Sequence, residues 1–292
     1  MRVSTFALAV VLLGCGETRP VKPAAAPSPA SKPSRSALAL LVEGLPRFDT
    51  RGLRNLLYDS PTFNYQILFV TPPDLARGGL PTQVHGEAGP GLKPLTGFPS
   101  TAADLARFDV IILGDLDPIA IGGHQGAARL VEYVRGGGGL LVICGRNHTP
   151  SDYLPTDLRE VLPFDQSLGY EEHGAMLELT EAGKAHELTR LSPDTKLNEE
   201  TWKEIGGRAG FVRVRGVAAA DVVLAEARFA PDPARAPDKK VTEPVLVAHS
   251  AGRGRVVVFL TDNLHALKNL ATNRKYQDDL HTRALMWARR KK

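Results

Sequence analysis

The side chains that could carry out chemistry lie directly after four short apolar runs of the sequence. They are Glu43 and Arg47; Asp115 and Asp117; Cys144, Arg146, Asn147 and His148; and Asp262, Asn263 and His265. Continuous apolar runs of this length are typical of strands that are buried on both faces. In open α/β sheets, ligands bind beyond the carboxyl ends of such strands. We therefore take these residues as the candidate site.

Cys144 is the candidate nucleophile of this group. A thiol attacks as its thiolate, and a neighbouring imidazole, from His265 or His148, could generate that thiolate. The alternative is a small buried cysteine at a strand end, where its sulfur acts as a minor hydrophobic group. We favour the buried cysteine, because nothing in the sequence places either histidine beside the thiol.

The charged residues of the group also have two interpretations each. Arg47 and Arg146 suit a carboxylate or phosphate ligand, which a guanidinium binds through two parallel hydrogen bonds. A structural salt bridge to Glu43 or Asp115 explains them equally well. Asp115 and Asp117 could form a general acid–base pair. Aspartates after a strand commonly accept hydrogen bonds within the next turn, however, and we favour that role.

The sequence contains no pattern typical of a metal, phosphate or nucleic-acid site. Its eight histidines show no HxxxH or HxxEH spacing, and two cysteines are too few for a zinc finger or an iron–sulfur cluster. The glycine run Gly136–Gly139 lacks the GK[ST] of a phosphate loop and precedes a strand instead of following one. The net charge of +4 is modest. We expect no metal, no cofactor and no nucleic-acid partner.

Alternating strands and helices must position these residues in the first half of the chain. The predicted strands are Ala37–Val42, Tyr65–Val70, Val110–Leu113 and Leu140–Cys144. The predicted helices are Thr50–Tyr58 (with Thr50 as a cap), Thr101–Ala106 and Gly126–Arg135. The segment Thr71–Pro99 is predicted to be one long loop. This order indicates a parallel sheet with helices on both faces.

The second half of the chain has a less regular pattern. Strands are predicted at Met176–Leu179, Val222–Ala227, Val245–Ala248 and Arg255–Leu260, and a closing helix at Tyr276–Arg290. With 292 residues, 43% of them hydrophobic, the chain has enough apolar side chains for a large core, which excludes wholesale disorder. We predict one domain, residues 37–292, with an insertion within residues 164–244.

The first residues of the chain differ from the rest. Residues 1–14 carry one charge, Arg2, followed by an apolar run, which is typical of a secretory signal. The run is too short for a bilayer, which takes about 20 apolar residues. It ends in Leu12-Leu13-Gly14-Cys15, which resembles the bacterial lipobox. This resemblance implies that Cys15 is lipidated and becomes the mature N-terminus. An ordinary signal peptide that contains a cysteine is the alternative.

Residues 15–36 are rich in proline, alanine, serine and lysine, which indicates an extended tether. A processing segment with no mechanical role is the alternative. We expect the protein to be anchored at the periplasmic face of the bacterial cell envelope through Cys15, with an envelope protein as a possible kind of partner. Gly16, where an aspartate would favour the inner membrane, favours the outer membrane in a Gram-negative host.

Five segments of the chain form a recognisable series: Val42–Arg47 (VEGLPR), Phe108–Pro118, Gly137–Tyr153, Leu179–Leu188 and Gly252–Leu267. In this order they resemble class I glutamine amidotransferase-like domains, from a bacterial group associated with von Willebrand A modules in membrane-anchored proteins. Val42–Arg47 matches a V-(D/E)-G-x-P-R element of that group. The resemblance covers nearly all of residues 37–289. It implies an α/β fold, a flavodoxin-like three-layer sandwich with a mainly parallel central sheet, and says less about activity.

The chain departs from the pattern of catalytically active amidotransferases. The residues after Cys144 differ from those of the nucleophile turn, and residues 261–265 contain no H-x-E. Related domains of the group generally have glycine where Cys144 stands. We therefore expect a non-catalytic binding or scaffold domain. The alternative is a Cys144-dependent amidase or hydrolase that acts on a small amide or an envelope substrate.

Overall fold

The computed structural model describes residues 36–44, 47–71, 83–205, 209–217, 222–228, 242–262, 264 and 273–291. The chain divides into two compact units, residues 1–35 and 36–292, and all the described residues belong to the second. The predicted signal, Cys15 and nearly all of the tether lie outside the described residues, as do Asn263 and His265.

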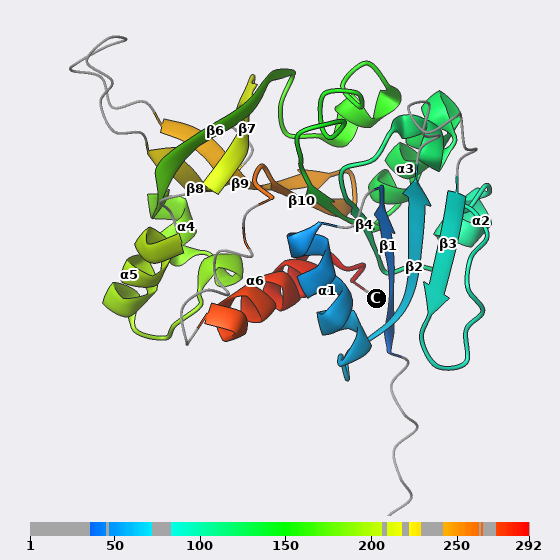
Figure 1. The fold of residues 1–292 in the computed structure, drawn as a ribbon, viewed down its shortest axis with the longest axis horizontal. Coiled ribbons are helices and arrows are strands. Elements are labelled where there is room, and N and C mark those ends of the chain that lie inside the picture. Colours follow the sequence, from blue (N-terminus) through cyan, green and yellow to red (C-terminus); the bar gives the residue numbers. More distant parts are fainter. Residues whose placement is uncertain are drawn as a thin grey trace, which may run out of the picture. The chain divides into compact units, whose positions relative to one another are not determined.

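One ten-stranded sheet, of order β3-β2-β1-β4-β5-β10-β9-β8-β6-β7, forms the centre of the second unit (Figure 1). Its strands are β1 (Ala37–Glu43), β2 (Phe63–Thr71), β3 (Gln83–Ala88), β4 (Val110–Leu113), β5 (Gly139–Ile143), β6 (Gln166–Leu179), β7 (Ala209–Arg215), β8 (Val222–Arg228), β9 (Thr242–Ala251) and β10 (Gly254–Phe259). The strands β2, β1, β4, β5 and β10 are parallel. The outer pairings are antiparallel.

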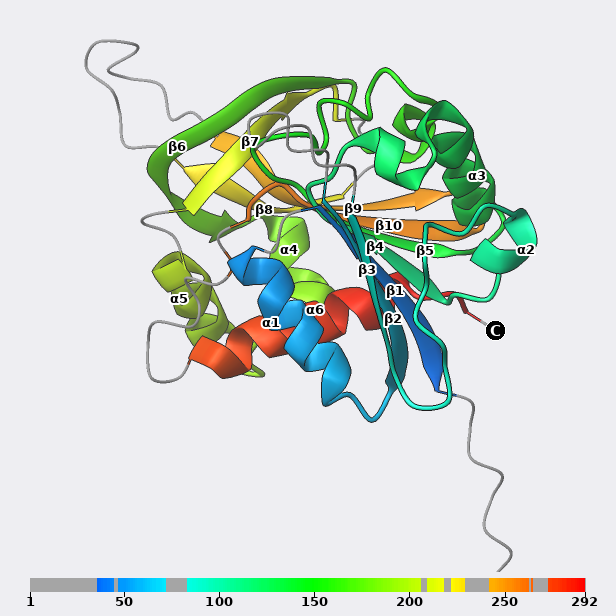
Figure 2. The ribbon, with the colours of Figure 1, turned by 45° about the vertical axis from the view of Figure 1, so that its right-hand side comes forward.

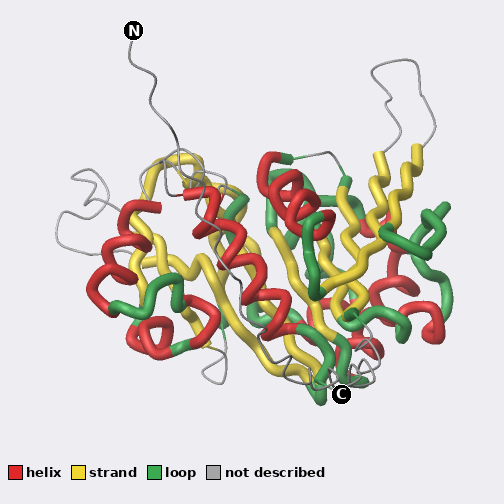
Figure 3. The backbone as a smooth tube through the Cα atoms, turned by 90° about the horizontal axis from the view of Figure 1, so that it is seen from below, coloured by secondary structure: helices red, strands yellow, loops and turns green. Residues whose placement is uncertain are grey.

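Helices cover both faces of the parallel strands. They are α1 (Phe48–Tyr58), α2 (Ala102–Leu105), α3 (Gly123–Arg135), α4 (Glu181–Ala185), α5 (Thr195–Ile205) and α6 (Asn273–Ala288), with the short helical turns η2 (Pro118–Ile121), η3 (Asp157–Val161) and η4 (Glu187–Thr189). In Figure 2, α1 and α6 lie side by side on one face, and α3 lies on the other. Figure 3 shows the same helices and strands from below. This arrangement confirms the predicted α/β class and its layers.

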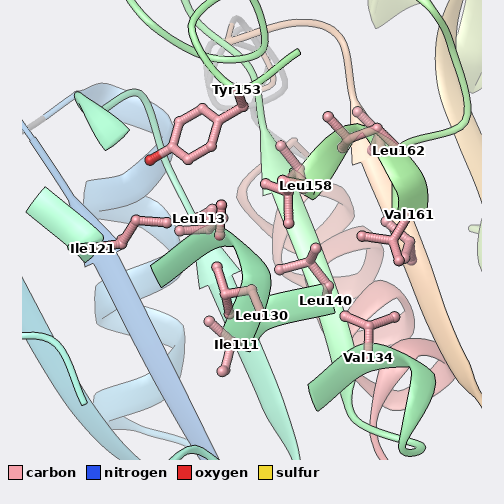
Figure 4. Close-up of a cluster of buried hydrophobic side chains, with 14 of the residues drawn as sticks. Ile111, Leu113, Ile121, Leu130, Val134, Leu140, Tyr153, Leu158, Val161 and Leu162 are labelled. Atoms are coloured by element: carbon pink, nitrogen blue, oxygen red, sulfur yellow. The ribbon is translucent and has the colours of Figure 1, made fainter. Parts of the chain in front are cut away.

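Each central strand contributes side chains to two hydrophobic clusters, because successive side chains of a strand point to opposite faces. Leu41 packs into the cluster on the side of α1 and α6, and its neighbour Leu40 packs into the cluster on the side of α3. Figure 4 shows the α3-side cluster, in which Leu140 of β5 lies near Leu130 and Val134 of α3. The innermost strands β4 and β5 therefore contain no polar side chain.

The second half of the chain extends the sheet. Residues 164–244, the predicted insertion, contain β6, β7 and β8 at one end of the sheet together with α4 and α5. The prediction of a strand at Met176–Leu179 covered only the end of β6, which pairs with β8 there and with β7 earlier along its length. The helix α5 and the strand β7 were not predicted.

Two predictions for the first half were wrong. The predicted loop Thr71–Pro99 contains the strand β3, which pairs with β2 along the sheet edge. Its half-exposed sequence QVHGEA has little apolar patterning, and its pairing uses backbone groups. Thr50 is not the N-cap of α1. The helix begins one turn earlier, with Arg47 as N-cap, and the Thr50 hydroxyl exchanges hydrogen bonds of 3.1 Å with the Arg47 backbone.

Candidate functional site

The carboxyl ends of β1, β4, β5 and β10 meet at one edge of the sheet, because these strands are parallel neighbours in that order. Their ends bring together residues that lie far apart in the sequence. We call this group the strand-end cluster. It consists of the buried Glu43, Asp115 and Cys144 and the partly buried Arg47 and Asp262.

Glu43 lies at the centre of the strand-end cluster, and its side chain is fully buried. Its Oε1 accepts hydrogen bonds of 2.9 Å from the backbone N–H groups of Gly44 and Asp115. Its Oε2 accepts from Nη2 and Nε of Arg47, at 3.1 and 3.3 Å. Burial raises the pKa of Glu43, while Arg47 and the two backbone donors oppose that shift. With four donors on its two oxygens, the carboxylate is occupied within the protein.

Arg47 connects three strand ends. Its Nη1 donates to the carbonyl oxygen of Cys144 and its Nη2 to that of Ile143, both at 3.0 Å. Its Nη1 also lies 3.8 Å from Oδ2 of Asp262. Burial alone would lower the pKa of Arg47, but the charges of Glu43, Asp115 and Asp262 raise it, so the guanidinium stays protonated. Arg47 thus forms the structural salt bridge to Glu43 that the sequence left open.

Asp115 organises the loop after β5. Its Oδ2 accepts from the N–H of Asn147 at 3.0 Å, and its Oδ1 accepts from those of His148 and Thr149 at 2.8 Å. Asp117 accepts from the N–H of Ile119 at 2.8 Å and caps η2. Asp117 thus accepts within the next turn, the role that we favoured over acid–base catalysis, whereas Asp115 accepts from a loop 32–34 residues further along the chain.

Two glycines make room for the buried carboxylates. A Cβ atom at Gly114 would overlap the carboxylate of Glu43, and one at Gly145 would overlap that of Asp115. The glycine after Cys144 is therefore required by the close approach of a carboxylate. It does not mark a strained nucleophile turn, because no described residue other than glycine has a positive φ.

The Cys144 thiol is fully buried and belongs to the α3-side hydrophobic cluster. Burial raises its pKa far above the usual range, an effect that Arg47 opposes and that Asp115 and Asp262 reinforce. Among the residues that the structure describes, no histidine acts on the pKa of this thiol. The Nδ1 atom of His148 lies 2.7 Å from Oδ2 of Asp152. His265, the other predicted base, lies outside the described residues.

A more exposed group of residues adjoins the strand-end cluster, and we call it the rim: the exposed Arg146, Asn147 and Glu172 and the partly buried Tyr170. Tyr170 donates to Oδ1 of Asp262 at 2.7 Å, and burial together with this bond raises the pKa of Tyr170. The guanidinium of Arg146 lies over the Tyr170 ring, 4.7 Å from its centre, and pairs with Glu172 at 2.5 Å. The sequence analysis missed Tyr170, because no strand was predicted around it.

The described residues contain no group of three or more histidine, cysteine, aspartate or glutamate side chains placed to hold a metal ion. Within the part of the chain that the structure describes, no helix is both long enough and apolar enough to cross a bilayer.

Comparison with known proteins shows the fold. No model of a protein family matches the chain, and neither does any curated protein. A cytoplasmic protein from Salmonella typhimurium matches in structure with a TM-score of 0.52 at 17% identity, over 86% of this chain and 99% of that one. A ThuA-like protein from Bacteroides uniformis matches with a TM-score of 0.50 at 11% identity, over 87% of this chain and 94% of that one.

The fold is glutamine amidotransferase-like. At such low identities the likeness shows the architecture alone, and any activity must be argued from the site.

The three backbone hydrogen bonds on Asp115 generate a stability prediction. Asp115→Asn replaces one acceptor oxygen by an NH₂ group, which then faces a backbone donor in a buried place. We expect the free energy of unfolding to fall by about 1–3 kcal/mol, measured by urea denaturation. Asp117→Asn is the matched control, because asparagine caps as well as aspartate does, and its effect should stay within about 0.5 kcal/mol. Equal effects of the two substitutions would contradict the organising role of Asp115.

Proposed function

We propose that this chain is a bacterial lipoprotein, anchored through Cys15, whose amidotransferase-like domain is a non-catalytic binding or scaffold domain in the cell envelope. It belongs, in this proposal, with the amidotransferase-like domains of membrane-anchored proteins that the sequence resembles. Its rim contacts an envelope protein.

The observation that carries the non-catalytic assignment is the state of Cys144. A nucleophilic cysteine must be reachable by a carbonyl carbon and must ionise near neutral pH. The Cys144 thiol has no exposed surface, and its environment favours the neutral form. The described residues therefore support the buried structural cysteine over the alternative amidase.

Because the residues of the strand-end cluster pair with one another, we propose that a partner protein contacts the rim instead. Glu43, Arg47 and Asp115 use their hydrogen-bonding groups on one another and on the backbone. The side chain of Arg47 is 15% exposed, whereas that of Arg146 is 55% exposed. A partner thus meets Arg146, Glu172 and the exposed Asn147, a mixed-charge surface that suits another protein.

The anchor in this proposal follows from the N-terminal sequence. Acyl chains on Cys15 contribute about 0.8 kcal/mol for each buried CH₂, and several chains on one cysteine hold a protein firmly at a membrane. A proline-rich tether would then keep the folded domain clear of the lipid headgroups.

The reactivity of Cys144 tests the non-catalytic assignment. In a Cys15→Ala background, Cys144 is the single thiol of the chain. Because burial raises its pKa and blocks access, we expect no labelling by iodoacetamide in the native protein between about pH 7 and pH 9, where a free thiol of pKa about 8.5 becomes reactive. One equivalent should react in denaturant. Rapid native labelling that levels off at neutral pH would support the amidase instead.

The location of a Cys15→Ala variant tests the anchor. We expect the wild-type protein in the membrane fraction of its host and the variant in the soluble fraction, because the variant has no residue to acylate. Cys144→Ala should stay with the membranes and serves as the matched control. Retention of the Cys15→Ala variant at the membrane would contradict the lipoprotein assignment.

Cross-linking in intact cells tests the rim. We expect the wild-type protein to give a specific cross-linked partner, and Arg146→Glu to lower its yield at least about tenfold, since a reversed charge at the contact loses the complementarity with the partner and costs more than about 1.4 kcal/mol of binding. Arg159→Glu, at an exposed position of η3, makes the same charge change and should keep the yield. Equal yields from both variants would contradict a role of the rim.

A further inference from the structure

A second concave surface lies along α1, and we call it the α1 cavity. It has a volume of about 200 Å³. Its described lining residues are Arg47, Phe48, Thr50, Arg51, Arg54 and Phe69. Positions 47, 50, 51 and 54 have the spacing of one helix face. Phe69 comes from β2, which packs beside α1. The cavity shares only Arg47 with the strand-end cluster.

The α1 cavity carries unbalanced positive charge. Three arginines line it, and none of its described lining residues is acidic. Glu43 neutralises Arg47. Arg54 forms a long ion pair, with its Nη1 3.6 Å from Oε1 of Glu87, and its guanidinium lies over the Tyr58 ring, 5.5 Å from the ring centre. Arg51 is exposed and forms no ion pair within the described part of the chain. The guanidinium of Arg51 is thus available to an anion, and Arg54 adds its positive charge to the lining of the same cavity.

The cavity also presents aromatic surface. The side chain of Phe48, which lines the cavity, is 68% exposed. Phe69 is partly buried and stacks on His85, with ring centres 6.4 Å apart. A flat apolar group in the cavity would cover both phenyl rings.

We propose that the α1 cavity binds a small aromatic anion, a carboxylate or phosphate monoester attached to a single ring. Arg51 and Arg54 bind the anionic group, because a guanidinium matches the oxygens of such groups with parallel donors. Phe48 and Phe69 contact the ring. The volume is below the roughly 300–1,000 Å³ of pockets for drug-sized ligands, which limits the ligand to one ring. This site goes beyond the proposed envelope function and does not depend on it.

Titration of the full-length protein with phenyl phosphate, followed by calorimetry, tests this site. We expect saturable binding, which Arg51→Gln weakens about tenfold. Phe48→Ala should weaken the binding of phenyl phosphate and leave that of inorganic phosphate unchanged. Arg159→Gln removes the same charge at an exposed position elsewhere and should change the affinity less than about twofold. Circular dichroism checks that each variant is folded.

Three results would overturn the proposal. They are the absence of saturable binding, equal weakening by Arg51→Gln and Arg159→Gln, and inorganic phosphate binding as tightly as phenyl phosphate. Equal weakening by the two substitutions would show that binding responds to the net charge of the protein and not to the α1 cavity. Equally tight binding of inorganic phosphate would show that the phenyl ring of the ligand contributes nothing. None of them bears on Cys15, Cys144 or Arg146, so a failure here is distinguishable from a failure of the envelope function.

Discussion

The buried ion pair between Glu43 and Arg47 holds together the sheet edge at which the candidate site lies. Glu43 joins the end of β1 to the end of β4 through the Asp115 N–H, and Arg47 joins both to the last carbonyl groups of β5. Removing Arg47 would leave the buried carboxylate of Glu43 without its cation, which costs several kcal/mol. The start of α1 depends on the same pair, because Arg47 is also its N-cap.

This ion pair explains why we propose a non-catalytic domain, although the strand ends carry residue types that are common in active sites. The carboxylates and the guanidinium at the strand ends are occupied by one another and by backbone groups, and Cys144 lies beneath them among aliphatic side chains. In this proposal, charged side chains that pair with one another inside the protein hold the loops in place and do not bind a substrate. Among the described residues, we propose two surfaces for recognition: the rim, where Arg146 lies over Tyr170, and the α1 cavity, which Arg51 lines.

The two surfaces have different chemistry. The rim carries one charge of each sign, Arg146 and Glu172, and we propose it for a protein partner, whereas the α1 cavity combines positive charge with phenyl rings, for which we propose a small anion. Arg47 lies between them, lining the cavity and bonded to the cluster under the rim. Since Asp262 lies near Arg47 and accepts from Tyr170, contiguous polar contacts link the cavity wall to the rim.

The sequence by itself determined the central strands, the main helices of the parallel layer and which residues follow the strand ends. Strands such as β4 have uninterrupted apolar runs because both of their faces are buried, and that pattern is local. The strand β3 escaped prediction because an edge strand pairs through its backbone and needs little apolar patterning. Only the tertiary structure decided which donors reach Glu43 and Asp115, that Tyr170 reaches Asp262, and that the Cys144 thiol is buried. These properties depend on residues far apart in the sequence, such as Asp115 and Thr149, whose contact local periodicity does not encode.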